Sequence, residues 1–145
     1  MITIGNFKDI NDTYDEVWFI VRSLKNGLPN TKRAGQIYRH VPQLSPSLNL
    51  FKDYLKWANN NEWNENCFME RYVPRFLEEM KSKEAKNALN TLYKMEKQKN
   101  ILLVCFCGKE NICHRSIVCG LMQGVGSNVN CNKNYKHFYD MYKKI

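Results

Sequence analysis

Short apolar runs divide this chain and predict its strands. Nearly continuous runs occur at residues 2–4, 17–21 and 101–106. Their length and their content of β-branched and aromatic residues are typical of strands buried on both faces of a sheet. Residues 36–44 alternate more loosely between apolar and polar side chains and are interrupted by Pro42, so we expect a further strand there.

Helical spacing of apolar residues fills most of the chain between these runs. We expect helices after Ser47, over residues 64–81, after Ser82, over residues 114–123 and over residues 134–145. Leu48, Phe51 and Leu55 give the first helix an apolar stripe. Pro74 predicts a kink or a late start in the second helix, and Gly124 is well placed to end the fourth.

The order of these elements favours one class of fold. Helices that lie between apolar strands predict a single α/β domain over residues 1–145, with a mainly parallel central sheet flanked by helices. Ligands of such sheets bind outside the carboxyl ends of the strands. Three of the expected strands are followed by polar groups, namely Gly5 and Asn6, Arg22 and Ser23, and residues 107–116. We expect these groups to line one crevice.

Composition and charge limit the classes of function that the protein can have. The hydrophobic content of 43% is that of a folded protein. No segment approaches about 18 uncharged apolar residues. The first residues also lack a basic stretch followed by a long apolar run, so we expect a cytoplasmic protein without a membrane partner. The formal net charge of +8 favours a negatively charged partner, either nucleic acid or a phosphorylated small molecule, unless the lysines merely solvate the surface.

Reactive side chains concentrate in the segment that follows the last apolar run. It holds Cys105, Cys107, Lys109, Cys113, His114, Arg115 and Ser116. In a cytoplasmic protein we expect the cysteines to be thiols rather than disulfides. If a helix begins near Cys113, its free N–H groups and its dipole favour an anion. Arg115, Ser116 and Lys109 could then bind the oxygen atoms of a phosphate, although a plain surface role is the alternative.

The same segment carries two other kinds of candidate chemistry. Cys107, Cys113 and His114 are candidate catalytic residues, because a cation and a helix N-terminus lower the pKa of a nearby thiol. The spacing from Cys107 to Arg115 is longer than that of the cysteine phosphatases, and simple packing of the thiols stays open. Together with Cys105 these residues are also zinc-type ligands, but they do not form two knuckles. We therefore expect neither a metal nor a cofactor, and a thiol redox or zinc protein is the third hypothesis.

Aromatic side chains line one side of the last expected helix. They are Tyr135, Phe138, Tyr139 and Tyr142. Such a face could stack bases, although packing into the core is the commoner use. With the lysine-rich helices it makes up the alternative hypothesis, a nucleic-acid-binding module.

Several short motifs, taken in their order along the chain, carry a family resemblance. They are Thr3-Ile4-Gly5, Val21-Arg22, Val41 to Leu44, Phe68 to Tyr72, Cys105 at a strand end, and Cys113-His114-Arg115. In these motifs the chain resembles an uncharacterised bacterial and phage family, the domain-of-unknown-function family 488. That family usually has His after the opening Gly and an acidic residue after the strand Cys, where this chain has Asn6 and Cys107. The resemblance implies an α/β fold and a site at these motifs, and it implies no particular reaction.

Our leading hypothesis is a cytoplasmic α/β protein that binds a phosphorylated nucleotide or nucleotide-like molecule at the carboxyl ends of its strands. Arg115 and the helix N-terminus would hold the phosphate, and Gly5, Asn6, Arg22 and Ser23 would line the other wall. Cleavage or transfer of the nucleotide fits this site, and so does sequestration, as by a phage antagonist of a nucleotide signal. Whether the protein is an enzyme stays open.

Overall fold

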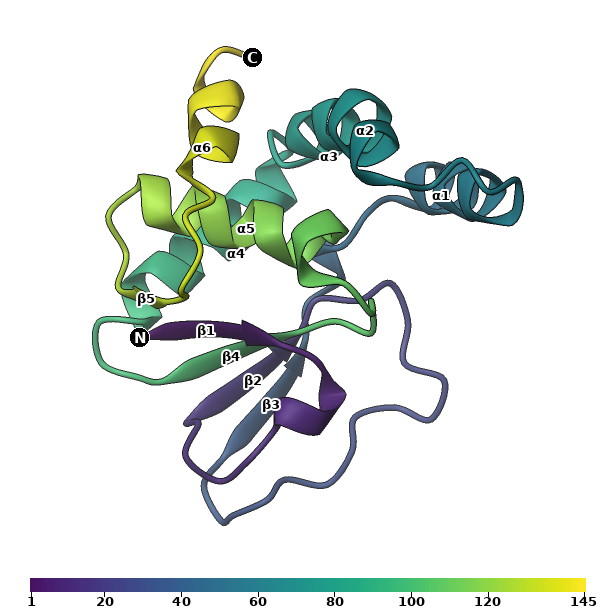
Figure 1. Ribbon diagram of the computed structural model, residues 1–145. Helices are drawn as coiled ribbons and strands as arrows, with labels where there is room; N and C mark the ends of the chain where they lie inside the picture. Colours follow the sequence, from purple (N-terminus) through teal and green to yellow (C-terminus); the bar gives the residue numbers. More distant parts are fainter.

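The centre of the protein is a five-stranded parallel sheet. The structure is a computed structural model that describes residues 1–145. The strands lie in the order β3-β2-β4-β1-β5, and every neighbouring pair is parallel (Figure 1). They are β1 (Ile2–Gly5), β2 (Glu16–Phe19), β3 (Ile37–His40), β4 (Ile101–Val104) and β5 (Val129–Asn130). The expected α/β fold with a parallel sheet is confirmed; β5 is not predicted, because two residues are too few to show a period.

Strand β4 lies between β1 and β2 and is paired with both of them. Val104, at its end, is paired with Gly5 on one side and with Phe19 on the other. All four residues of β4 are buried, as its continuous apolar run predicts. The carboxyl ends of β1, β4 and β2 therefore form one continuous edge, which is where an open parallel sheet binds ligands.

The helices gather on one side of the sheet. They are α1 (Leu48–Asn59), α2 (Glu65–Cys67), α3 (Val73–Glu79), α4 (Lys83–Met95), α5 (His114–Gly124) and α6 (Lys136–Lys143). Figure 1 shows them above the sheet, whereas the links from β1 to β2 and from β2 to β3 run on the other side. Ser47 and Ser82 cap α1 and α4 as expected, each accepting a backbone N–H three residues on. None of the helices combines the length and apolar character that crossing a bilayer requires.

Pro74 disrupts the second helical segment, as expected. A wider π-helical turn, Phe68–Tyr72, separates α2 from α3, and Pro74 lies in the first turn of α3. Proline has no N–H to donate and its ring crowds the preceding turn, so the backbone widens just before it. This turn buries Phe68 and Tyr72 and directs the Tyr72 ring toward the carboxyl edge of the sheet.

Helix α1 differs from its sequence pattern. Leu48, Phe51 and Leu55, which form its apolar stripe, are 49%, 37% and 41% exposed, and Leu50 is the one residue of the helix that is buried. The helix lies beyond the carboxyl edge of the sheet rather than over its face (Figure 1). Its stripe therefore does not enter the main core.

Helices α5 and α6 pack unusually closely. A Cβ atom on Gly120 would lie 2.1 Å from the carbonyl oxygen of Tyr135, and one on Gly124 would lie 2.1 Å from the Tyr139 ring. Tyr135 is 6% and Phe138 1% exposed, so this part of the aromatic face packs into the core instead of offering rings to bases. Gly124 is the last residue of α5, but the C-cap position expected for it is occupied by Val125, and Gly124 makes the close contact with Tyr139. The positive φ of 86° that ends α5 belongs to Gly126.

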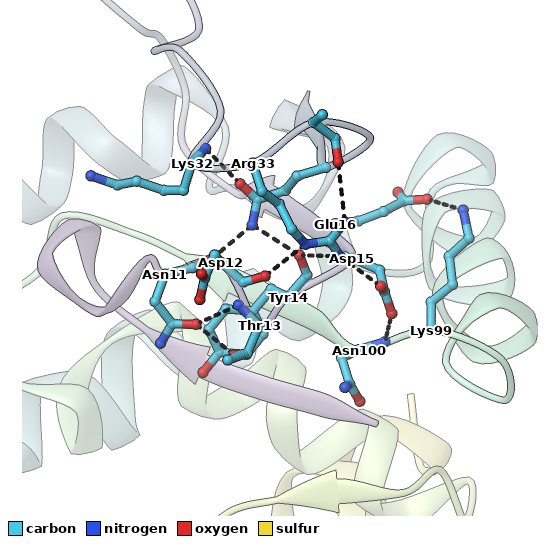
Figure 2. Close-up of polar contacts among 12 residues, drawn as sticks. Asn11, Asp12, Thr13, Tyr14, Asp15, Glu16, Lys32, Arg33, Lys99 and Asn100 are labelled. Atoms are coloured by element: carbon cyan, nitrogen blue, oxygen red, sulfur yellow. Dashed lines mark hydrogen bonds and ion pairs between the residues drawn. The ribbon is translucent and has the colours of Figure 1, made fainter.

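A polar network holds the opposite, amino end of the sheet. Glu16 is fully buried and accepts hydrogen bonds from Arg39 Nε at 2.6 Å, Lys99 Nζ at 2.7 Å and Trp18 Nε1 at 2.9 Å. Nearby, Asp15 pairs with Arg33 at 2.9 Å (Figure 2). The network ties β2 to its neighbours β3 and β4 and holds the long link before β3 in place.

Glu16→Gln tests this network. Burial opposes ionisation of Glu16, but the hydrogen bonds from Arg39, Lys99 and Trp18 outweigh it and lower its pKa. The Gln variant should lose about 2 kcal/mol of unfolding free energy at pH 7, less than a fully buried pair would cost, because Arg39 and Lys99 are partly solvated. A lowered carboxyl pKa stabilises the fold above the ordinary pKa and ceases to do so as pH falls through the folded value. Urea titrations should therefore show the difference shrinking below about pH 4.5, whereas Glu62→Gln, at an exposed pair, should match the wild type throughout.

Gly120→Ala tests the α5–α6 contact. In an unconstrained helix the substitution would stabilise by about 1 kcal/mol, but here the methyl group meets backbone and cannot be accommodated by a side-chain rotation. We expect a net loss of about 2 kcal/mol or more in urea denaturation. Gly108→Ala, at a position with open space, is the matched control. Equal midpoints for the two variants would contradict the close packing.

Candidate functional site

A cavity of about 300 Å³ opens beyond the carboxyl ends of β2 and β4. Aromatic side chains from α1 and the π-helical region form its wall, and Arg22 and Ser23 lie at its exposed mouth. Three thiols and an imidazole also line it; they belong to Cys105, Cys107, Cys113 and His114. The volume is at the small end of the range for ligand pockets, about 300–1,000 Å³.

The aromatic wall is built by mutual ring contacts. The Trp63 ring meets Tyr54 edge-on at 4.7 Å and Tyr72 at 5.6 Å between centroids. Trp57 stacks on the Trp63 ring at 6.3 Å, and Tyr72 stacks on Phe76 at 6.0 Å. Each edge-to-face or offset contact stabilises its partners by about 0.5–1.5 kcal/mol. The wall therefore keeps its shape without a ligand.

Cys105, Cys107, Cys113 and His114 form a compact cluster, which we call the thiol–imidazole cluster. One ligand-type atom from each residue lies within 4.8 Å of the others. The sulfur atoms of Cys105 and Cys113 are 2.9 Å apart, and Cys113 Sγ is 3.7 Å from His114 Nδ1. Cys105 directly follows β4, while Cys113 and His114 begin α5, so the intervening loop folds back on itself.

Burial and mutual contact set the pKa values of the cluster. The thiols of Cys107 and Cys113 hold the pKa of Cys105 far below its ordinary value, and His114 and Arg115 add to the effect. The pKa of Cys107 is raised chiefly by Cys105, and burial raises that of Cys113. These directions favour ionisation of Cys105 over ionisation of Cys107 and Cys113. Burial lowers the pKa of His114, so its imidazole is neutral at pH 7.

His114 has a defined orientation. Its Nε2 atom lies 2.7 Å from the carbonyl oxygen of Ile20, just beyond β2. A carbonyl can only accept, so Nε2 carries the proton and Nδ1 keeps a free lone pair on the side of Cys113.

Arg115 lies behind the cavity rather than in it. Its side chain is 4% exposed, and Nη1 donates to the carbonyl oxygen of Gly5 at 2.9 Å. Its Nε atom is buried without a hydrogen-bond partner, and the guanidinium takes part in no ion pair. The cation nevertheless acts on the thiols, since it lowers the pKa of Cys105 and Cys107. The charge expected to hold a phosphate thus lies outside the cavity lining and acts on the thiol–imidazole cluster.

The other predicted site residues divide between cavity and scaffold. Arg22, Ser23, Cys107, Cys113 and His114 line the cavity together. The remainder have other surroundings: Gly5 accepts from Arg115, Asn6 caps the turn at residues 7–9, Ser116 donates to the Cys113 carbonyl, and Lys109 lines a neighbouring cavity of about 450 Å³. Of the three strand ends expected to share one crevice, those of β2 and β4 contribute to the cavity lining, and that of β1 does not.

Sequence reasoning did not predict the aromatic wall. Tyr54 and Tyr72 come from segments assigned only as helices and Trp63 from the link between them, and their rings meet through tertiary packing. A usable signal was present, since aromatic residues are unusually dense over residues 51–76. Such density at helical spacing ordinarily means core packing, and only the position of α1 beyond the sheet edge turns it toward a cavity.

These features define a class: an open parallel α/β protein with an aromatic cavity and a thiol–imidazole cluster at the carboxyl edge. Residues 2–126 match the model of the family described as the active DUF488-N3 subclade, so the chain belongs to this family. The resemblance carried by the short motifs is thereby confirmed. Comparison with curated proteins and with solved structures found no match.

The tautomer of His114 is directly measurable. Because Nε2 donates to Ile20, long-range ¹H–¹⁵N NMR spectra should show the Nε2–H form alone at pH 7. The proton should exchange slowly with solvent, since His114 is 5% exposed. A spectrum of the Nδ1–H form would mean that the ring is held differently and that the lone pair does not face the thiols.

Proposed function

We propose that the protein binds a phosphorylated nucleotide or a nucleotide-like small molecule in the cavity at the ends of β2 and β4. The observation that carries this proposal is the combination of a preformed aromatic wall with an unpaired cation at the mouth. Such a site suits a molecule with a planar ring at one end and negative charge at the other.

The wall supports the planar part of the ligand. Tyr54, Trp63 and Tyr72 present ring edges and faces already fixed by their contacts. Stacking of a base on an aromatic side chain stabilises binding by about 1–3 kcal/mol. A rigid wall also avoids the entropic cost of ordering side chains on binding.

Arg22 supports the charged part. Its side chain is exposed and makes one long contact, 3.5 Å from Nη1 to the carbonyl oxygen of Pro46. The guanidinium can therefore turn to a phosphate, with the Ser23 hydroxyl beside it. Arg22 takes the place that the sequence hypothesis assigned to Arg115, and the net charge of +8 favours an anion throughout.

The thiol–imidazole cluster forms the part of the cavity wall nearest the end of β4. A ring bound in the cavity would lie against this cluster. Cleavage or transfer of the nucleotide requires such a contact, and sequestration is compatible with it. The description of the family as an active subclade favours a chemical step.

Arg22→Gln is the decisive variant, because an exposed side chain can be changed without disturbing the fold. Full-length protein screened by thermal shift against nucleoside mono-, di- and triphosphates should respond to at least one compound. For that compound, calorimetry should show binding about tenfold or more weaker in Arg22→Gln, the cost of one charge-assisted hydrogen bond. Arg71→Gln, which breaks an exposed pair with Glu62, should bind as the wild type does.

Two outcomes would overturn the proposal. One is a wild type whose unfolding temperature no nucleotide raises, and the other is unchanged affinity in Arg22→Gln. Binding of single-stranded oligonucleotides with a steep salt dependence, without a response to mononucleotides, would instead favour the nucleic-acid alternative.

A further inference from the structure

The thiol–imidazole cluster has a composition and a geometry that hydrogen bonding among thiols does not explain. Three sulfur atoms and one imidazole nitrogen lie within 4.8 Å of one another, and Cys105, Cys113 and His114 are buried. Cys105 and Cys113 find no partner but each other and the rest of the cluster. Soft thiolates with an imidazole are the donor set of tetrahedral zinc sites.

His114 is oriented as a metal ligand would be. A coordinating histidine almost always donates its second ring N–H to a carbonyl or carboxylate, which fixes the ring and leaves the other nitrogen for the metal. Here Nε2 donates to the carbonyl of Ile20 at 2.7 Å, and Nδ1 faces Cys113 Sγ at 3.7 Å.

Arg115 requires negative charge beside it. This guanidinium is 4% exposed, has no carboxylate partner, and its Nε atom is unpaired. A buried cation of this kind is costly unless an opposite charge is near. Three thiolates with one divalent cation carry a net charge of −1, which Arg115 neutralises. A disulfide between Cys105 and Cys113 would remove that charge and leave Cys107 and His114 without a role.

We propose that Cys105, Cys107, Cys113 and His114 bind one zinc ion. Zinc–sulfur bonds of about 2.3 Å give a tetrahedron with edges of about 3.8 Å. The observed set needs only small side-chain rotations to reach it, chiefly an opening of the 2.9 Å contact between Cys105 and Cys113.

The fold explains why the ligand spacing misleads. Cys105 and Cys107 leave the end of β4, Cys113 and His114 start α5, and the loop between them returns the chain to the same place. The two pairs of ligands, each close in sequence, thus supply four ligands to one ion, as two zinc knuckles do in other proteins. This proposal replaces the expectation that the site lacks a metal. Because four protein ligands close the coordination sphere, the ion holds the loop and the start of α5 against β4. The proposal does not depend on what the cavity binds.

The test measures metal directly. Full-length protein is purified under reducing conditions without chelator, and elemental analysis should find about one zinc per chain. Exchange for cobalt(II) should give thiolate-to-cobalt charge-transfer absorption in the near ultraviolet and the visible bands of a tetrahedral ion. Removal of zinc with a chelator should lower the unfolding temperature, and addition of zinc should restore it.

Single-residue variants identify the ligands. Cys107→Ser changes the least buried ligand, so the variant should fold. Its cobalt charge-transfer absorption should fall by about one third, because one of three thiolates is lost. The variant should also release zinc to a chelator far more readily than the wild type. Cys131→Ser changes another half-buried cysteine outside the cluster and should leave both properties unchanged.

Reduced wild-type protein that carries no zinc and gives no tetrahedral cobalt spectrum would overturn the proposal. A Cys105–Cys113 disulfide in mass spectra, in protein that binds no cobalt after reduction, would overturn it in favour of a dithiol pair. Equal cobalt spectra for Cys107→Ser and the wild type would exclude Cys107 as a ligand and with it the four-ligand site.

Discussion

The insertion of β4 between β1 and β2 is the constraint on which the rest of this structure depends. It aligns the ends of three strands, because Val104 is in register with Gly5 and with Phe19. The chain leaves this edge with Cys105 and returns to it with Cys113, and α5 then runs back along the sheet. The cavity lies beyond the ends of β2 and β4, and the thiol–imidazole cluster forms where the chain leaves this edge and returns to it.

One buried arginine contributes to the electrostatics at this edge. Arg115 fastens the start of α5 to β1 through the Gly5 carbonyl and at the same time places an unpaired positive charge beside the thiols. The hydrogen bonds with Cys107 and Cys113 are the main cause of the lowered pKa of Cys105, and the charge of Arg115 adds to it. The opposite end of the sheet has the reverse arrangement, a buried carboxylate at Glu16 held by cations from neighbouring strands. Each end of the sheet thus buries charge, and each relies on its surroundings to compensate it.

Much of the fold was predictable because local rules and tertiary packing agree. The serine caps at Ser47 and Ser82, the disruption at Pro74 and the apolar run of β4 all have local causes that survive in the folded protein. The failures lie where packing overrides the local pattern. Helix α1 carries an apolar stripe of core type and yet lies beyond the edge of the sheet. Gly124 is the last residue of α5 but also makes a close contact with Tyr139, which no local pattern shows.

The sequence by itself determined the fold class, the family and the segment in which reactive side chains are concentrated, because apolar period, caps and motif order are local properties. Only the tertiary structure decided which residues meet. In the structure Arg115 contacts the Gly5 carbonyl oxygen instead of lining the cavity, and Arg22 lies at the cavity mouth. Tyr54, Trp63 and Tyr72 form the aromatic wall. The tertiary structure also brought Cys105, Cys107, Cys113 and His114 within 4.8 Å. Spacing along the chain could not show this, since the distance between ligand atoms is set by the path of a loop and by the strand and helix to which it is anchored.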